Sequence, residues 1–267
     1  MQPLDAHDFA SARPLFTAAT YARSFPFAVL DGHHAGSVTV DAEPPTAALV
    51  ALMAGFHVFG GDPANAAFLR EAAAQTVRRS ADEYVLFLPL AQSWRAPLEA
   101  ALDGYGAFWA ERLEFTLDPG AVAAHGDWRA RLPSGGRLLP YDRGLTASAP
   151  GVADFWGGGE AGIDRFLAHG LGCALLLDGE VVCRAHTVFV GDGIAETSIE
   201  TEEPHRRRGY ALTTTLAYLE WCNARSLRPS WSCWAHNAAS QALAAAVGFT
   251  APVVVPVLVV KKGGAGG

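Results

Sequence analysis

The apolar and polar positions of this chain follow two periods, and each change of period marks the boundary of an element. Apolar residues at every third or fourth position predict helices, whereas short apolar or alternating runs predict strands. In the first half, the pattern predicts helices over about 5–20, 65–80 and 93–104, and strands around 48–59, 84–90 and 108–117. The stretch "FAVLDGHHAGSVTV" (27–40) predicts a hairpin that turns at Asp31–Gly32.

The second half repeats this order of elements. Residues 118–152 are rich in glycine and proline and contain one predicted strand, "GRLLPYD". A helix over about 160–168 precedes the hairpin "CALLLDGEVVCRAHTVFV", which turns at Asp178–Gly179. The rest of the pattern predicts a strand over 194–201, a helix from Tyr210, a strand over 230–235, a helix over 237–248 and a strand over 252–260.

The recurrence predicts an α/β protein with two structurally related halves. The two hairpin turns take corresponding places, and "PLEAALDGYGAFWAERLEF" matches "QALAAAVGFTAPVVVPVLV" with one residue of slip. Two unrelated α/β segments of similar length can also look alike, so the pattern alone leaves both interpretations open. We place a first lobe at 1–117, a second domain at 118–262 and a flexible tail at 263–267.

Composition and charge restrict the class of protein. With 50% hydrophobic and only 18% charged residues, the 267-residue chain can bury a substantial core. Its net charge of -7 argues against nucleic acid or an anionic membrane as the main partner and is compatible with an amine substrate. The longest apolar run, "APVVVPVLVV", predicts a strand, and no signal peptide precedes the first elements. We expect a cytoplasmic protein, either monomer or homodimer.

The cysteines and histidines do not form a recognisable metal motif. Cys173, Cys183, Cys222 and Cys233 show no CxxC spacing and are predicted to be buried, reduced thiols. Three histidines fall near the site predicted below, where each is either a catalytic imidazole or a structural side chain: His186, His205 and His236. We therefore expect no metal.

The stretch "TEEPHRRRGYALTTTLAYLEW" places three arginines where a helix begins. A helix N-terminus already carries partial positive charge, so cations there are normally unfavourable. Unpaired N–H groups, a small Gly209 and guanidinium groups together suit a multiply charged phosphate. The alternative is a solvated charge run that Glu200, Glu202 and Glu203 neutralise. The segment alone does not decide between these interpretations.

The pattern around "RRRGYA" resembles the R/Q-x-x-G-x-G/A signature of the GNAT superfamily of acyl-CoA N-acyltransferases, with Arg206, Gly209 and Ala211 at its fixed positions. The later "NAASQALAAAVGF" is similar to the N-x-x-[AS]…GF helix of that superfamily. The resemblance covers roughly 135–260 and, more loosely, the whole chain, where it points to a bacterial subfamily of two-lobed proteins.

The resemblance implies acetyl-CoA as co-substrate and an amine, either small or peptidic, as acceptor. Its pyrophosphate would lie on the turn formed by Arg206, Arg207, Arg208, Gly209, Tyr210 and Ala211. Pantetheine would lie between the strands 194–201 and 230–235, beside Ile199 and Thr201, and would contact Asn237 and Ser240. Asn237 is also a good helix N-cap, and the two roles are compatible.

The reaction requires a base for the amine and a donor for the developing oxyanion. The resemblance favours Glu196 as the base, with Glu200 on the same face of the strand as the second candidate, and the N–H near Thr201 as the donor. Where many members carry a tyrosine that protonates the leaving thiolate, this chain has Ala244, so water or Ser240 would serve. Two other hypotheses therefore stay open: a regulatory protein that binds acyl-CoA without transfer, and a plain binder of phosphate ligands.

The first lobe is expected to lack a cofactor site. The corresponding place is "HVFGGDPANAAFLREA", where no arginine precedes Gly60 and Gly61, and Asp62 adds negative charge. We therefore predict a degenerate GNAT-like lobe that packs against the second domain and forms one wall of the acceptor site.

Overall fold

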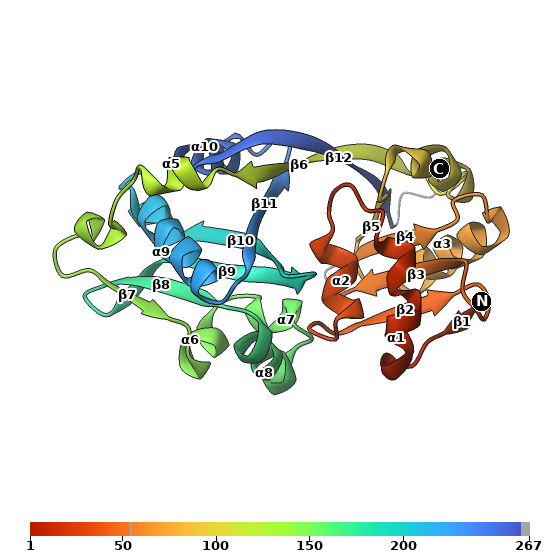
Figure 1. Cartoon of the computed structure of the whole chain (residues 1–267), viewed down its shortest axis with the longest axis horizontal. Helices are drawn as coiled ribbons and strands as arrows, with labels where there is room; N and C mark the ends of the chain where they lie inside the picture. The colour runs from red at the N-terminus through yellow and green to blue at the C-terminus, as the bar shows by residue number, and fades with distance from the viewer. Residues whose placement is uncertain (54, 263–267) are drawn as a thin grey trace. The chain divides into compact units, whose positions relative to one another are not determined.

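The computed structural model describes residues 1–53 and 55–262, which divide into two compact units. Unit 1 comprises Met1–Arg112 together with the chain from Val254 onward, and unit 2 comprises Leu113–Val253. Each is a mixed sheet with helices packed on it, which confirms the predicted α/β class (Figure 1). Within the described residues, every helix is too short or too polar to cross a membrane.

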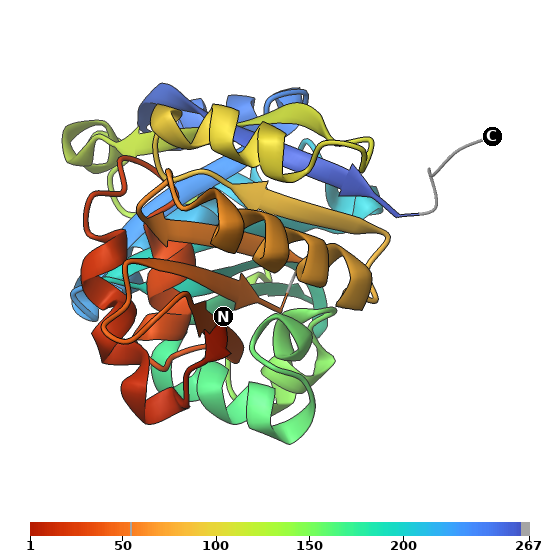
Figure 2. The same cartoon turned by 90° about the vertical axis from the view of Figure 1, so that its right-hand side faces the viewer.

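Unit 1 is built on a sheet in the order β1-β2-β3-β4-β5-β12. Neighbouring strands run antiparallel except β4 and β5, which are parallel. The strands are β1 (Gln2–Pro3), β2 (Gly36–Val40), β3 (Ala47–Leu52), β4 (Phe56–Gly61), β5 (Tyr84–Leu88) and the end of β12 (Phe249–Lys261). The helices are α1 (Phe9–Ala12), α2 (Ser24–Leu30), α3 (Ala66–Arg79) and α4 (Arg95–Ala101), with 3-10 turns at Ala6–Asp8, Arg13–Phe16 and Gln92–Trp94. Helix α3 crosses the sheet (Figure 2), where Phe68 meets Phe59 of β4 edge-on at 6.1 Å.

Unit 2 is built on a sheet in the order β6-β11-β10-β9-β8-β7. Its strands are β6 (Phe108–Leu117), β7 (Arg137–Pro140), β8 (Gly172–Leu177), β9 (Glu180–Gly191), β10 (Ile194–Thr201) and β11 (Arg228–Trp234). Its helices are α5 (Pro119–Ala123), α6 (Arg143–Ser148), α7 (Val152–Phe155), α8 (Gly159–His169), α9 (Tyr210–Ala224) and α10 (Ala238–Val247), with 3-10 turns at Trp128–Arg131 and Glu203–His205. Helix α9 lies along β8, β9 and β10 (Figure 1), and its Tyr218 and Ala217 are fully buried.

The same order of elements occurs twice along the chain. In each of the two sets, the last strand ends in the other unit. Three antiparallel strands, a helix, a parallel strand and a second helix follow one another as β2-β3-β4-α3-β5-α4 and again as β8-β9-β10-α9-β11-α10. The strand after α4, β6, ends in unit 2 beside β11, whereas the strand after α10, β12, ends in unit 1 paired with β5. The predicted second domain, 118–262, contained all of β12. In the structure, the end of β12 from Val254 onward belongs to unit 1 instead.

The predicted first hairpin is wrong, because its first arm is helix α2. The run from Phe25 to Leu30 is entirely buried, and a continuous apolar run fits a buried helix as well as a strand. The expected turn is the end of this helix: Asp31 N–H donates to Phe27 O, and Gly32 has a φ of 74°. The two aspartate–glycine turns are therefore not equivalent. The second hairpin is confirmed, since Leu177 pairs with Glu180 across Asp178 and Gly179, both with positive φ.

Two other expected elements are interrupted. The helix predicted over 5–20 is a series of short turns, because Pro14 restricts the backbone before it and opens a separate 3-10 turn. The strand predicted over 48–59 is two antiparallel strands, β3 and β4, and Gly55 between them has a φ of 73°. The remaining predicted elements are present with ends shifted by a few residues.

Gly61 provides a test of how tightly the end of β4 packs. A Cβ there would stand 2.1 Å from Thr46 O, whereas a Cβ at Gly104, which has a similar φ (90° and 81°), meets no atom within 4 Å. We expect Gly104→Ala to lower the free energy of unfolding by about 1 kcal/mol, the cost of a left-handed backbone. Gly61→Ala adds overlap with backbone and should cost about 3 kcal/mol or more. Urea denaturation measures both, and equal losses would contradict the packing described.

Candidate functional site

The turn between β10 and α9 presents backbone N–H groups that no side chain caps. Strand β10 ends at Thr201, and Gly209 precedes the helix in a left-handed conformation with a φ of 80°. A Cβ placed on Gly209 would meet no atom within 4 Å. The N–H groups of the first helical turn have no partner within the helix, so this end of α9 is open to an anion.

The three arginines of this turn are exposed and lack carboxylate partners. Arg206 Nε donates to Thr201 O at 3.0 Å, which holds its guanidinium group at the end of β10. Among the residues that the structure describes, none of the three guanidinium groups forms a salt bridge, and Glu202 pairs instead with Arg184. The neighbouring acidic residues therefore do not neutralise this charge run by direct pairing.

Strands β10 and β11 are parallel neighbours over only three rungs. Ile194, Ala195 and Glu196 pair with Arg228, Pro229 and Ser230, and pairing stops there. The rest of β10 continues to pair with β9 on its other edge. Because Glu202 N–H donates to Val182 O of β9 at 3.0 Å, the N–H of Thr201 points to the edge that faces β11. The divergence of the two strands follows the arrangement expected for residues 194–201 and 230–235.

Of the two candidate bases, one is buried and one is exposed. Glu196 is only 4% exposed, and its carboxylate accepts a hydrogen bond from the Ser232 hydroxyl of β11. It lies at the last rung of the β10–β11 pairing and opposite an irregularity in the register with β9. Glu200, further along β10, is exposed. The sheet therefore gives these two carboxylates different surroundings.

The start of α10 brings three of the predicted residues together. Asn237 caps the helix, since its side-chain oxygen accepts from Ser240 N at 3.0 Å. The Ser240 hydroxyl accepts from Trp231 Nε1 at 3.0 Å, which links the helix to β11. Ala244 is fully buried in the core. The N-cap role of Asn237 is thus observed.

A group of buried hydroxyls beneath α9 was not found from the sequence. The side-chain oxygens of Thr197, Thr214 and Tyr218 are buried, and the structure gives them no hydrogen bond of normal geometry. Burial raises the pKa of Tyr218, whose hydroxyl lies beside Thr197 and Cys222. All four cysteines are buried, reduced thiols, as predicted. No sequence signal marks the hydroxyls, because threonines inside a helix usually face solvent or their own backbone.

The three candidate histidines do not meet at one place. His186 is buried and stacks on Tyr141 with ring centroids 6.2 Å apart, whereas exposed His236 stacks on Trp234 at 6.3 Å. His205 is half-buried beside Tyr210 of α9. The structure therefore gives no pairing of an imidazole with Glu196.

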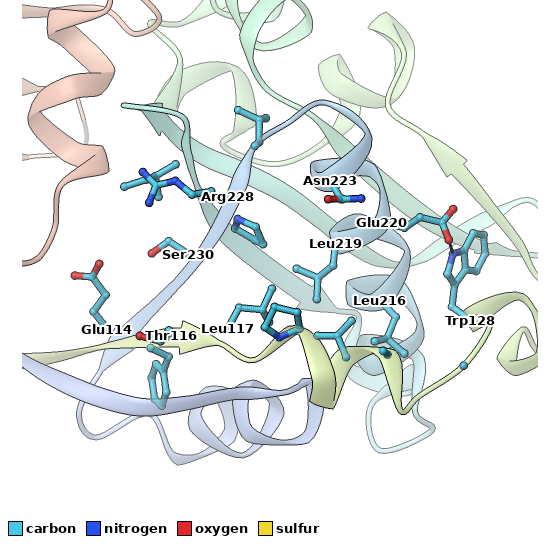
Figure 3. Close-up of a pocket in the computed structure, with 18 residues that line it drawn as sticks. Glu114, Thr116, Leu117, Trp128, Leu216, Leu219, Glu220, Asn223, Arg228 and Ser230 are labelled. Carbon is cyan, nitrogen blue, oxygen red and sulfur yellow. Dashed lines mark hydrogen bonds between the residues drawn. The ribbon is translucent and has the colours of Figure 1, made fainter.

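A pocket of about 780 Å³ lies between β6, α5, α9 and β11, all within unit 2. We call it the β6–α9 pocket. Figure 3 shows Leu117 of β6 and Leu219 of α9 pointing into the space between them, with Glu114 and Ser230 at the other side. At the rim, Glu220 accepts from Trp128 Nε1 at 3.0 Å and from Arg129 at 2.8 Å. Sequence reasoning missed this pocket, because residues from four separate elements line it.

The corresponding turn of unit 1, between β4 and α3, is closed by its own side chains. Asn65 caps α3 by accepting from Phe68 N at 3.2 Å, and Asp62 accepts from Ala64 N at 2.9 Å. Asp41, which holds Asn65 Nδ2 at 2.9 Å, has its pKa lowered to about 2; burial opposes this shift, and hydrogen bonds from Thr46 and Ala47 outweigh it. Carboxylates and the Thr46 backbone thus fill the space that an anion would need.

Unit 2 is thus an α/β sheet unit in which an uncapped helix end, two parallel strands with limited pairing and a buried carboxylate lie along one strand. The model of the family described as GNAT acetyltransferase matches residues 13–254. The chain therefore belongs to the GNAT acetyltransferase family.

Three similar proteins match this chain over more than nine-tenths of its length. The uncharacterized N-acetyltransferase YdfB of Bacillus subtilis (strain 168) is 25% identical over 258 residues, which cover 93% of this chain and 94% of that protein. A GCN5-related N-acetyltransferase-like protein from Streptococcus suis 89/1591 has a TM-score of 0.69 at 22% identity, covering 95% of this chain and 98% of the other. A tandem GNAT protein from the clavulanic acid biosynthesis pathway has a TM-score of 0.62 at 15% identity, covering 99% of each chain. These two structures show the shared fold.

His186 should make unit 2 sensitive to acid. Burial, and secondarily Arg184, lowers the pKa of His186 from 6.5 to about 4. Below pH 6.5 the unfolded chain binds a proton that the folded chain excludes, so stability falls as the pH falls towards 4. The loss from pH 6.5 to 5 should be about 2 kcal/mol. In urea denaturation at pH 7 and pH 5, His186→Gln should lose less stability on acidification than the native chain. An identical loss in both would show that His186 does not contribute.

Proposed function

We propose that this chain transfers an acetyl group from acetyl-CoA to a primary amine. The observation that carries the proposal is the β10–α9 turn, where an uncapped helix N-terminus follows three exposed arginines that form no salt bridge with any described residue. Phosphate oxygens match both kinds of donor. Membership of the GNAT acetyltransferase family supports acetyl-CoA as the phosphate-bearing ligand.

The cofactor turn is proposed to run from Arg206 to Ala211, and its fit can be judged by comparing the two units. At Gly209 nothing stands within 4 Å of an added Cβ, so a pyrophosphate has room against the backbone. In the corresponding turn of unit 1, a Cβ added at Gly61, the last residue of β4, would stand 2.1 Å from Thr46 O. The contrast supports one binding turn per chain, in unit 2.

Further along β10, the unpaired edge suits a pantetheine arm. Alternate N–H groups of a strand point to the same edge, so those of Ile199 and Thr201 both face the side of β11. The Asn237 amide and Ser240 lie at the start of α10, just after β11. We propose that these groups hold the arm along the edge of β10, between the cofactor turn and Glu196.

Acetyl-CoA supplies an activated acetyl thioester, and the side chains of the protein move the protons. Glu196 takes a proton from the attacking amine, directly or through water, as the nitrogen–carbon bond forms, and the N–H near Thr201 donates to the carbonyl oxygen. As the carbon–sulfur bond breaks, a proton is returned to sulfur by water or by the Ser240 hydroxyl. Ser232 holds the Glu196 carboxylate in place through its hydrogen bond.

A second candidate function is binding of acyl-CoA without transfer. It is favoured by one observation: the buried methyl group of Ala244 stands where a tyrosine acid is expected from family resemblance. The two candidates share the cofactor turn and differ in whether Glu196 affects turnover.

Gly209→Glu tests the cofactor turn. The variant places a carboxylate and added bulk against the pyrophosphate, so acetyl-CoA affinity should fall at least tenfold, or about 1.4 kcal/mol. Gly209→Asn is the matched control, because asparagine tolerates a left-handed backbone and adds no charge. Calorimetry on the native chain should give one acetyl-CoA per chain. Unchanged affinity in folded Gly209→Glu, or two sites per chain, would refute the assignment.

Glu196→Gln tests the base. The amide keeps the size of the side chain and can still accept from Ser232, so acetyl-CoA binding should stay near that of the native chain. Turnover with a reactive amine, followed by release of CoA thiol, should fall about 10²-fold or more. Glu200→Gln, on the same strand but exposed, is the control and should have little effect. If both variants keep full turnover, Glu196 is not the base; if no amine supports turnover in the native chain, binding without transfer is favoured.

A further inference from the structure

Two side-chain hydrogen bonds tie the start of α10 to β11 and to the residue that follows it. Trp231 Nε1 donates to the Ser240 hydroxyl oxygen at 3.0 Å, and Gln241 Nε2 donates to Ala235 O at 2.7 Å. Within the helix, the Asn237 side chain accepts from Ser240 N at 3.0 Å. Because the helix is joined to the strand at two points, its first turn is held in one place beside β11.

Trp231 is the rigid member of this group. It is only 1% exposed, and its ring packs against Phe249 with the ring centroids 5.4 Å apart. It is also the first residue of β11 after Ser230, where the register with β10 ends. Since the core fixes the indole ring, the direction of its N–H is fixed as well, and the Ser240 hydroxyl adjusts to it.

The bond from Trp231 decides how Ser240 can use its hydroxyl group. An indole N–H can only donate, so the Ser240 oxygen is the acceptor and its own hydrogen points elsewhere. Among the residues that the structure describes, none accepts a hydrogen bond from this hydroxyl, and Ser240 is only partly buried. The hydrogen is therefore available to a ligand.

Ser240 and the cofactor turn belong to the same side of the sheet. Helices α9 and α10 contact each other, and both contribute to the buried core that contains Trp231. Ser230 precedes Trp231 and is the register partner of Glu196, so alternation places Glu196 on the opposite face. Ser240 thus lies on the side where α9 begins and where we propose that acyl-CoA binds.

A serine in this place suits a hydrogen-bond donor better than an acid. A serine hydroxyl is a much weaker acid than a thiol, whose ordinary pKa is about 8.5. If Ser240 gave its proton to the departing thiolate, the protein would be left with an alkoxide, a stronger base than the thiolate itself. Donation of a hydrogen bond carries no such cost, because the proton stays on the serine.

We infer that Trp231 is a positioning residue, which fixes the Ser240 hydroxyl so that its hydrogen is donated to a carbonyl oxygen of the acyl-CoA arm. Ser240 then binds the co-substrate and keeps its proton, so water is the source of the proton that sulfur receives. The inference rests on the proposed function for the identity of the ligand.

Calorimetric titration with acetyl-CoA tests the donor. Ser240→Ala removes one hydrogen bond to the arm, so affinity should fall about fivefold, or about 1 kcal/mol. In turnover with a reactive amine, KM for acetyl-CoA should rise by a similar factor while kcat stays nearly unchanged. A fall in kcat without a loss of affinity would show that Ser240 acts as the acid, and would overturn the inference.

Trp231→Phe tests the positioning role, because it keeps an aromatic ring beside Phe249 and removes the donor. With three staggered positions then open to the hydroxyl hydrogen, affinity should fall about threefold. In the Ser240→Ala background, the same change should have no further effect, since Trp231 acts through Ser240.

Trp156→Phe is the matched control. It removes another fully buried indole, whose Nε1 donates to Thr187 O at 3.3 Å, and it should leave acetyl-CoA affinity unchanged. The same loss of affinity in Trp156→Phe, or an equal loss from Trp231→Phe with and without Ser240, would show that Trp231 serves only the core.

The indole N–H resonance of Trp231 gives a test that leaves the indole ring in place. Saturating acetyl-CoA should shift this resonance in the native chain, because donation by the Ser240 hydroxyl polarises the oxygen that accepts from the indole. The shift should be absent in Ser240→Ala. Acetyl-CoA binding without the shift, or with unchanged affinity in Ser240→Ala, would refute the inference and leave the proposed function intact. A native chain that does not bind acetyl-CoA would refute both.

Discussion

Strands β10 and β11 pair over only three rungs, and most of the chemistry proposed for unit 2 depends on this limit. Two parallel strands that paired throughout would satisfy each other's N–H and C=O groups and leave nothing for a ligand. Here the last rung falls at Glu196 and Ser230, and the register between the two strands ends there. The β10–α9 crossover places the start of the helix beyond the last residue of β10. The anion site that we propose, the N–H groups of Ile199 and Thr201 and the buried Glu196 therefore follow one line along β10.

The two units repeat the same order of elements but differ at the turn that precedes the helix, α9 in unit 2 and α3 in unit 1. Both sets of elements contain an antiparallel triplet followed by a helix and a parallel strand. In unit 2 the turn before the helix is left-handed, uncapped and rich in arginine. In unit 1, Asn65 caps the helix, and Asp62 and Asp41 satisfy nearby N–H groups. The N-terminus of α9 is thus open to the anion that we propose, whereas the N-terminus of α3 is capped by the side chain of Asn65.

Much of the fold could be predicted from the sequence where a local signal was strong. The Asp178–Gly179 hairpin, the helix after Gly209 and the cap at Asn237 all depend on neighbouring residues, and all are present. The first hairpin failed because an unbroken apolar run such as Phe25–Leu30 has no periodicity that separates strand from helix. The placement of β6 in unit 2 and of the end of β12 in unit 1 could not be predicted, because a single sequence does not show which distant strands pair. The roles of Glu196, Glu200 and Ser240 stay predictions, although burial now separates the first two.

The exchange of strands gives the first set of elements a structural part in the site of the second. Strand β6 follows α4 of the first set, yet its residues from Leu113 onward belong to unit 2. Phe115 and Leu117 supply one wall of the β6–α9 pocket, and Glu114 and Thr116 also line it. Removing the first set would remove this wall as well as the partner of β11 on that side. A repeat whose own turn before the helix is closed by its side chains is therefore still required for the sheet that carries Glu196, because its last strand is the neighbour of β11.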